Sequence, residues 1–482
     1  MKKIFAFLMI ICVGFTILSS TGCSNDNKNN VAQILEEGNG EPSPDAEEKK
    51  PVVDESKLMY SNFNQEDFGD LPVIRINTED QVFPVSKEDY VNCSFAMENA
   101  GEYNFEVTMK DSPKDGDAVG IRRRGNSTYS MPKKPFRVKF NKKKSLLGLE
   151  KAKSWVLLAD YIDQSSIRNY TAFSLANYFD GLGFTPNPNH VILFLNDEYM
   201  GLYLLTEQID ENAGRTDVKE DFEINDGADY PFLVEMSHDI QDGIDIFNIE
   251  NYEPFEIKYP EYDERLVNGD EDPVFDYIKS YFEAVFATIY DHTKEVNFNG
   301  NIVKFSDLVD EDSFIDYILL NELMINTDNV WKSTYFYKSK DGKLIFGPIW
   351  DFDWSMSTHW TGKPYDSSYI SCAQFVEILR KSQIANLYIQ DPVNYSKVQE
   401  RWNLAYDKLV NKDTGINKRI RDYKEEIINQ ARCDASYWYG ETGKFQFDMQ
   451  YDYVRLFLID RIEFLNDTFN LDYSDFMELI SE

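Results

Sequence analysis

The hydrophobic and polar positions of this chain change their period along the sequence. From residue 71 to about 145, short segments rich in β-branched and aromatic residues are separated by Asp, Gly, Pro and Lys turns, which is typical of β-strands. These segments are 71–77, 90–98, 103–110, 118–125 and 135–140. Beyond about residue 270, apolar residues recur at spacings of three and four, the period of a helix. The pattern predicts an α+β protein in which a β-rich N-terminal lobe precedes a helix-rich C-terminal lobe.

Local signals place several elements within this outline. A helix is predicted over about 165–180, with Ser165 as its N-cap and Gly181 directly after it. Two apolar runs joined at residues 196–198 predict a β-hairpin, and a second hairpin is centred on Asp341-Gly342. Further helices are expected over 273–290, 313–326 and most of the last hundred residues. The predicted body is a core over 67–365, with a β-rich lobe to about 207 and a helical lobe from about 208, and a helical extension over 366–482.

The first 22 residues have the pattern of an export signal. Lys2 and Lys3 precede an apolar run that is short for a membrane span and ends in small residues. Ser20-Thr21-Gly22-Cys23 resembles a bacterial lipobox, which implies lipidation of Cys23; the alternative is an ordinary secretory signal. Residues 23–66 are polar and acidic, which predicts a disordered tether. We therefore expect a lipid-anchored protein at the extracytoplasmic face of the cell membrane.

Charge and cysteine usage narrow the classes of function. The chain has 84 acidic and 49 basic residues, a formal net charge of −35, which argues against a nucleic-acid partner. Its four histidines disfavour a multi-histidine metal site and a histidine-based triad. Beyond the export segment remain Cys93, Cys372 and Cys433, and the sequence does not decide whether any two of them pair. The body must therefore be stabilised chiefly by its hydrophobic core.

One basic segment stands out against this acidity. Seven Lys and Arg residues lie between Arg122 and Lys139, and they flank the turn Gly125-Asn126-Ser127. Guanidinium groups bind phosphate through paired hydrogen bonds, and the backbone N–H groups of a glycine turn can add more. Alternation over 136–140 places Arg137 and Lys139 on one face of a strand. The segment is a candidate phosphate site; the alternative is a solvated basic surface that pairs with acidic neighbours.

Two acidic segments flank the second predicted hairpin. Asp328 lies at the end of an apolar helix, and Asp351 and Asp353 lie in Trp350-Asp351-Phe352-Asp353-Trp354. The hairpin should bring the segments close together. Asp351 and Asp353 share a face and could bind a divalent cation with phosphate oxygens, while Asp328 could accept a proton from a hydroxyl nucleophile. The alternative is ordinary turn and cap chemistry.

Taken together, these segments resemble the CotH family of spore-coat kinase-like proteins. The matching segments are Arg124 to Ser127 with the basic strand after it, Trp155 to Asn169, Tyr199 to Glu207, Asn326 to Asp328 and Trp350 to Asp353. They occur in order from about residue 70 to beyond 355, and the tail after about 365 matches loosely. The resemblance implies an atypical protein-kinase-like fold that binds ATP and Mg²⁺ (or Mn²⁺) and phosphorylates hydroxyl side chains of secreted or surface proteins.

The resemblance also assigns roles by position. Asp328 corresponds to the catalytic aspartate and Asp351 to the magnesium ligand, and Asp353 and Asn329 are further metal candidates. The implied nucleotide-binding residues are Arg124, Asn126, Ser127, Lys139 as the phosphate-binding lysine, and Glu207 at or near the hinge. The family often has a run of Asn shortly after the catalytic aspartate, where this chain has Lys332-Ser333-Thr334.

Two other functional classes stay open at this point. One is a non-catalytic cell-surface binding or scaffold protein on the same fold. The other is a secreted enzyme that acts on glycans through paired carboxylates, a chemistry that has no need for the basic strand.

Overall fold

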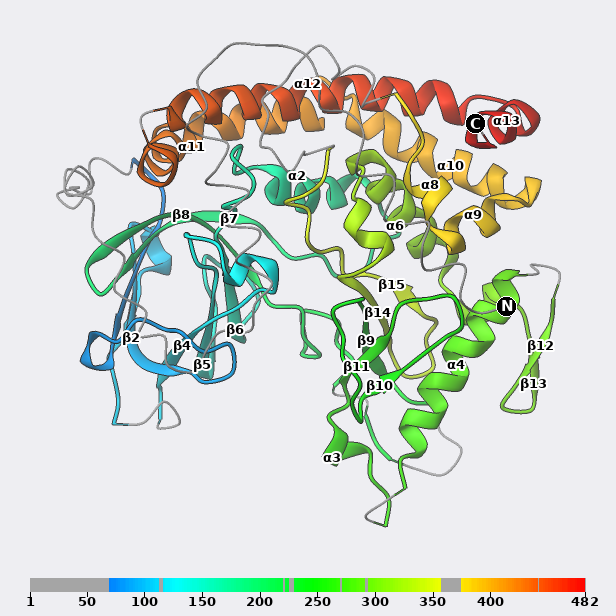
Figure 1. Ribbon diagram of the computed structural model, residues 1–482, viewed down its shortest axis with the longest axis horizontal. Coiled ribbons are helices and arrows are strands. Elements are labelled where there is room, and N and C mark those ends of the chain that lie inside the picture. Colours follow the sequence, from blue (N-terminus) through cyan, green and yellow to red (C-terminus); the bar gives the residue numbers. More distant parts are fainter. Residues whose placement is uncertain are drawn as a thin grey trace, which may run out of the picture. The chain divides into compact units, whose positions relative to one another are not determined.

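The computed structural model describes residues 69–111, 116–219, 222–224, 229–268, 271–290, 294–356, 374–440 and 442–481. Both strands and helices are abundant there, which confirms the α+β class (Figure 1). The predicted signal 1–22, Cys23, the tether 23–66 and Cys372 lie outside the described residues. In the described part of the chain, no helix combines the length and the apolar character that a membrane span requires.

Seven strands close into a barrel. They are β1 (Val73–Thr78), β2 (Val91–Glu98), β4 (Val119–Arg123), β5 (Phe136–Lys144), β6 (Ala152–Leu158), β7 (Asn189–Leu195) and β8 (Glu198–Glu207). Their order is β1–β7–β8–β6–β5–β4–β2, and β2 pairs with β1 to complete the ring. All neighbours are antiparallel except β1 and β7, and β3 (Phe105–Val107) extends the sheet beyond β2.

Alternating side chains fill this barrel. Phe136, Val138 and Phe140 of β5 are buried in its interior with Trp155 of β6, whereas Lys139 points outward and is exposed. Burial of these large apolar groups contributes about 25 cal/mol per Å² and stabilises the closed sheet. Strand β6 is not among the elements that the sequence pattern predicts.

The first predicted hairpin is confirmed as β7–β8. Asn196 and Asp197 connect the two strands, with φ angles of 54° and 62°. Asn and Asp tolerate this left-handed conformation better than most residues, and a two-residue turn of this kind matches the twist of the strands. The turn is therefore specified locally by the sequence.

A second sheet of five strands follows the barrel. It contains β9 (Phe232–Met236), β10 (Ile246–Phe247), β11 (Phe255–Tyr259), β14 (Thr334–Lys338) and β15 (Ile345–Phe346), in the order β10–β11–β9–β14–β15. The pair β14–β15 is the second predicted hairpin, whereas β9, β10 and β11 were not predicted. Helix α4 (Pro273–Tyr290) packs on this sheet, and the ring of Phe282 lies 5.1 Å from that of Phe255.

Short elements connect the second sheet to the helix that precedes Asp328. They are α3 (Tyr262–Arg265), the hairpin β12 (Val296–Phe298) and β13 (Asn301–Val303), and α5 (Phe305–Leu308). Helix α6 (Glu311–Met324) then begins at the N-cap Asp310, whose carboxylate accepts a hydrogen bond from Ser313 N. It ends at Ile325, which has a φ of 47°. The helix predicted over 313–326 is thus present, two residues earlier.

The helix predicted over 165–180 is shorter than expected. Helix α2 covers Arg168–Leu175 and is followed by a 3-10 turn over Ala176–Tyr178. The assignment of Ser165 as N-cap was wrong, because the N-cap position is Ile167 and makes no side-chain cap. The Asp163 carboxylate instead accepts a hydrogen bond from Arg168 N at 2.8 Å.

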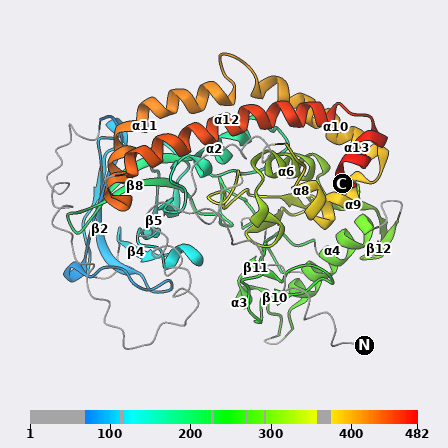
Figure 2. The same cartoon turned by 45° about the horizontal axis from the view of Figure 1, so that its top comes forward.

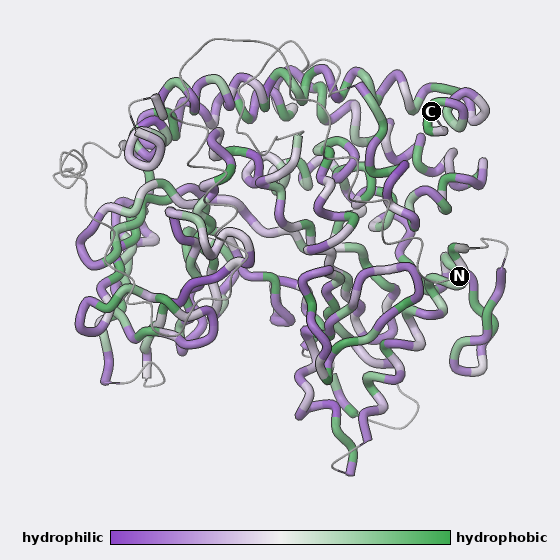
Figure 3. Tube along the Cα trace, in the orientation of Figure 1, coloured by the Kyte–Doolittle hydropathy of each residue, from purple (hydrophilic) through white to green (hydrophobic). Residues whose placement is uncertain are grey.

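The C-terminal part is helical, as predicted. Its helices are α8 (Ile378–Lys381), α9 (Gln383–Ile389), α10 (Pro392–Leu409), α11 (Ile416–Tyr439), α12 (Gly443–Phe469) and α13 (Tyr473–Ser481). The long helices α11 and α12 lie side by side (Figures 1 and 2). Hydrophobic and hydrophilic residues alternate along α12 and along the barrel strands (Figure 3). Helix α11 contacts β8, and α12 contacts α6, so this pair connects the barrel to the helical part.

Candidate functional site

The two acidic segments lie next to each other, and the residues after Asp328 hold them there. Asp328 stands in a 3-10 turn over Thr327–Val330, directly after α6. Lys332 Nζ lies 3.1 Å from Asp328 Oδ2. The Ser333 hydroxyl donates to Asp351 Oδ2 at 2.8 Å. Two consecutive side chains thus contact the two aspartates.

Burial and the repulsion of neighbouring carboxylates disfavour the ionised forms of Asp328 and Asp353. Burial raises the pKa of Asp328, and the charge of Asp351 raises it further, whereas Lys332 lowers it. Asp353 is buried, and burial together with Asp351 raises its pKa well above the usual value. Its Oδ1 atom finds no hydrogen-bond partner among the described residues. Asp351 itself has a φ of 68°, which is unusual for a residue other than glycine.

Arg124 brings the basic segment to these carboxylates. Its guanidinium lies 5.2 Å from the centroid of the Trp350 ring, directly before Asp351. Burial lowers the pKa of Arg124, and the negative charges of Asp351 and Glu235 oppose this shift. The half-buried Arg137 is close enough to affect Arg124 electrostatically, and its Nη2 donates to Ser154 Oγ at 3.1 Å.

Lys139 lies farther along the same outer face of β5. It stands opposite Gly120 of β4 and Ser154 of β6, and its ammonium group is 5.9 Å from the Tyr90 ring centroid. Although the side chain is largely exposed, partial desolvation and the neighbouring cations Arg137, Lys153 and Arg122 lower the pKa of Lys139, and Glu211 opposes this shift. Of the basic segment, Arg124 is therefore the residue that interacts with Asp351, while Lys139 belongs to an adjoining patch of cations.

The turn that carries Asn126 and Ser127 borders a cavity. Gly125 has a φ of 91°, and a side chain there would collide with Thr128, so the turn requires glycine. Asn126 Nδ2 donates to Asp239 Oδ2 at 3.3 Å, which links the turn to the segment after β9. A cavity of about 500 Å³ is lined by Asn126 and by residues from Glu235 to Lys258. Ser127 is exposed at the start of a 3-10 turn.

Two of the sequence-predicted residues are engaged in local hydrogen bonds. Glu207, at the end of β8, is buried and accepts from Asn187 N at 2.7 Å and from Asn187 Nδ2 at 3.0 Å. The Asn329 amide donates to the Tyr317 hydroxyl and, at 3.2 Å, to Thr334 Oγ1. The contacts described for these two side chains do not include Asp351.

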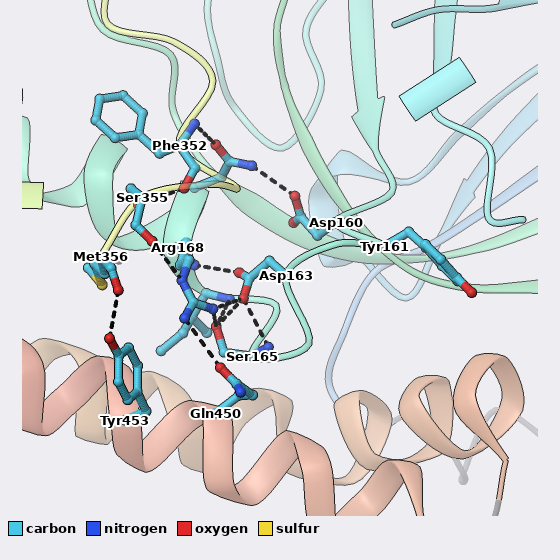
Figure 4. Close-up of polar contacts among 12 residues, drawn as sticks. Asp160, Tyr161, Asp163, Ser165, Arg168, Phe352, Ser355, Met356, Gln450 and Tyr453 are labelled. Carbon is cyan, nitrogen blue, oxygen red and sulfur yellow. Dashed lines mark hydrogen bonds and ion pairs between the residues drawn. The ribbon is translucent and has the colours of Figure 1, made fainter. Parts of the chain in front are cut away.

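Sequence reasoning missed a clamp at the start of α2, which is formed by Arg168 (Figure 4) and by the next residue, Asn169. Asn169 Oδ1 accepts from Phe352 N at 2.9 Å, and its Nδ2 donates to Asp160 Oδ1 at 2.9 Å. Burial and the charge of Asp163 raise the pKa of Asp160 to about 7. Asn169 therefore fixes the peptide between the two carboxylates of the Asp-x-Asp segment. The sequence indicates the segment Trp155 to Asn169 only through its resemblance to the family and assigns no role to Arg168 or Asn169.

Arg168 holds the other end of the same segment. Its buried guanidinium pairs with Asp163 and donates to Ser355 O at 3.3 Å and to Gln450 Oε1 at 3.3 Å. The Tyr453 hydroxyl donates to Met356 O at 2.9 Å. Gln450 and Tyr453 are three residues apart and so share one face of α12 (Figure 4). The C-terminal helices thus contribute to the placement of Asp351 and Asp353.

These residues fit a Mg²⁺ ion that is bound partly by phosphate. Within the described ranges, no group of three or more His, Cys, Asp or Glu side chains could hold a metal by itself. Mg²⁺ commonly uses one or two carboxylates and completes its shell with water and phosphate oxygens. Asp351 and the unpartnered oxygen of Asp353 match that smaller requirement.

Comparison with known protein families gives a match over most of the chain. Residues 121–465 match a family described as CotH kinase protein, which covers more than two thirds of the chain. The matched segment includes the basic turn, the clamp on α2, both acidic segments and most of α12. The comparison with curated proteins found no match.

Proposed function

Because the chain belongs to the CotH kinase family, we propose that it is a protein kinase that transfers the γ-phosphate of ATP to Ser or Thr hydroxyls of secreted or surface proteins. The observation that carries the proposal is that the basic turn meets the two acidic segments: Arg124 lies over Trp350, directly before Asp351, and the consecutive residues Lys332 and Ser333 contact Asp328 and Asp351. Phosphoryl transfer depends mainly on positioning and on charge stabilisation, and it needs these groups together. In this proposal the barrel and the helical part act as the two lobes of a kinase-like fold.

Each group has a distinct part in the proposed reaction. The substrate hydroxyl oxygen forms a bond to the γ-phosphorus, the bond to the bridging oxygen breaks, and ADP leaves. Asp328 accepts the hydroxyl proton, for which its raised pKa makes it a better base than an ordinary carboxylate. Arg124 stabilises phosphate charge, with Lys139 and the Asn126-Ser127 turn as further contacts. Asp351 and Asp353 would hold Mg²⁺ or Mn²⁺, which when bound neutralises the phosphates.

The proposed location is the outer face of the cell membrane. The export signal and Cys23 support a lipid anchor, and residues 23–66 supply a tether of low hydrophobicity. Substrates would then be secreted or surface proteins. Mass spectrometry of the protein from membranes would detect lipid on Cys23 as the N-terminal residue, and an unmodified new N-terminus would refute the anchor.

A non-catalytic binding protein on the same fold is the second candidate. The observation that favours it is the ion pair between Asp328 and Lys332, which engages the proposed base. Nucleotide binding without phosphate transfer would support this alternative.

The test uses residues 49–482, which contain all of the described residues. This protein should incorporate label from γ-labelled ATP into an acceptor protein or itself with Mg²⁺ or Mn²⁺. Asp328→Asn should lose transfer but keep nucleotide binding, and Asp351→Ala should lose both. Asp448→Asn, which removes a partner of Arg432 on α11, is the matched control and should behave as wild type. The kinase proposal would be refuted if the protein showed no phosphate transfer and no nucleotide-induced rise in Tm.

A further inference from the structure

Lys332 lies among the acidic side chains of the site, and its contacts fix its position there. Its Nζ is 3.1 Å from Asp328 Oδ2, and the two side chains are only 20% and 24% exposed. Lys332 N also donates to Asp328 O at 2.9 Å, so the backbone fixes the direction in which the side chain leaves the turn. The next residue, Ser333, holds Asp351.

The surrounding charges keep this lysine cationic. Burial lowers the pKa of Lys332, but Asp328 and Asp351 act in the opposite direction, and the net shift is upward. Asp239 contributes in the same sense. Without the ammonium group, Asp328, Asp351 and Asp353 would repel one another in a partly buried site, where charges interact more strongly than in water.

We propose that Lys332 is a built-in cation that compensates Asp328 and Asp351 and lowers the affinity of the nucleotide-free site for divalent metal. A fixed positive charge repels an incoming Mg²⁺ or Mn²⁺ ion, so that the metal enters effectively only together with the negative phosphates of the nucleotide. This inference rests on the proposed function, since it assumes that a nucleotide binds at this site. The effect of Lys332 on metal binding, however, does not depend on phosphate transfer. The simple alternative is a helix-type ion pair at spacing four, which contributes little when it is exposed.

The experiment measures Mn²⁺ binding to residues 49–482 without nucleotide, by the loss of the free-ion signal in electron paramagnetic resonance. Lys332→Met should bind Mn²⁺ about tenfold more tightly than wild type, since a nearby positive charge has been removed. Lys332→Arg keeps the charge and should bind as weakly as wild type. Lys397→Met is the matched control, because Lys397 also pairs with a carboxylate, Glu311 at 2.8 Å, and it should not change Mn²⁺ affinity.

A gain in affinity is a stringent outcome, because a misfolded variant would not bind metal more tightly. Adding Asp351→Asn to Lys332→Met should abolish the gain and so locate it at this site. Unchanged or weaker binding in Lys332→Met, or an equal gain in Lys397→Met, would overturn the inference. If Lys332→Met does not fold, Lys332→Gln carries the same expectation.

The same protein separates this inference from the kinase proposal. If the metal gain occurs but no variant binds or transfers phosphate from ATP, Lys332 has the inferred role and the kinase proposal fails. If ATP is used but the Lys332 variants bind Mn²⁺ as wild type does, the kinase proposal stands and Lys332 is an ordinary ion-pair partner.

Discussion

The guanidinium of Arg124 lies over the ring of Trp350, 5.2 Å from its centroid. This contact joins the turn after β4, in the barrel, to the residue directly before Asp351. A guanidinium on an aromatic face keeps its charge while part of it is shielded from water. Arg124 is therefore held beside the acidic site with hydrogen-bonding groups that a phosphate could use.

Arg124→Met is expected to weaken nucleotide binding more than Lys139→Met. Arg124 interacts with Asp351 and Glu235, whereas Glu211 is the acidic residue near Lys139. Loss of a charge-assisted contact should raise the Kd for ATP with Mg²⁺ about tenfold or more for Arg124→Met, as measured by titration calorimetry. Arg75→Met removes another guanidinium that lies over a ring, that of Phe194, and should leave the Kd unchanged. A larger effect at Lys139 would make that lysine the main phosphate contact.

Asn169→Leu should increase the flexibility of the backbone in the Asp-x-Asp segment, residues 351–353. The variant removes the acceptor for Phe352 N and the donor to Asp160. Amide hydrogen exchange, read by mass spectrometry on a peptide covering 349–356, should accelerate about tenfold. Asn394→Leu is the control, because Asn394 is also buried and donates to a backbone carbonyl, that of Tyr388. Equal exchange of this peptide in the two variants would contradict a positioning role for Asn169.

Lys133→Met should strongly destabilise the contact between the barrel and α11. Lys133 Nζ lies 2.9 Å from Asp434 Oδ1, and both side chains are buried. Removing one partner leaves a buried, uncompensated carboxylate, which should lower the free energy of unfolding by about 3–5 kcal/mol in urea titrations. The double variant with Asp434→Asn should recover much of this loss, because an amide oxygen can still accept from Leu202 N. A single-variant loss below about 1 kcal/mol would show that the pair is not a major contact.

His190 should make the protein less stable as the pH falls below about 6.5. Burial, with a smaller effect of Lys133, lowers the pKa of His190 to about 3, and its Nδ1 lies 2.7 Å from the Tyr423 hydroxyl. Between these two pKa values the unfolded chain binds a proton that the folded chain does not, so stability rises with pH across this window.

The measurement is the free energy of unfolding at several pH values from 4 to 7. His190→Gln cannot titrate, so the stability of wild type relative to this variant should increase by about 1.4 kcal/mol per pH unit within the window. Parallel curves for the two proteins would show that His190 does not contribute in this way.

The local sequence was sufficient to predict an element wherever interactions between near neighbours in the chain determine the backbone conformation. Asn196-Asp197 specified the β7–β8 hairpin, and the apolar period specified α4 over its full length of Pro273–Tyr290. The alternation in β5 placed Phe136, Val138 and Phe140 on one face, which the barrel buries. In each case the deciding interactions lie within a few residues of one another, so one sequence segment contains the information.

Contacts between residues that are distant in the chain decided the remaining features of the fold and of the site. Closure of the barrel depends on β1 pairing with both β2 and β7, which separate stretches of the sequence supply. Neither composition nor period could show whether Arg124 or Lys139 interacts with Asp351. The same holds for the hydrogen bond between Asn169 and Phe352, which are 183 residues apart. The sequence determined which groups were available and the local shape of most segments. Only tertiary packing decided which charges are buried together, because burial and electrostatic interaction depend on distance in space.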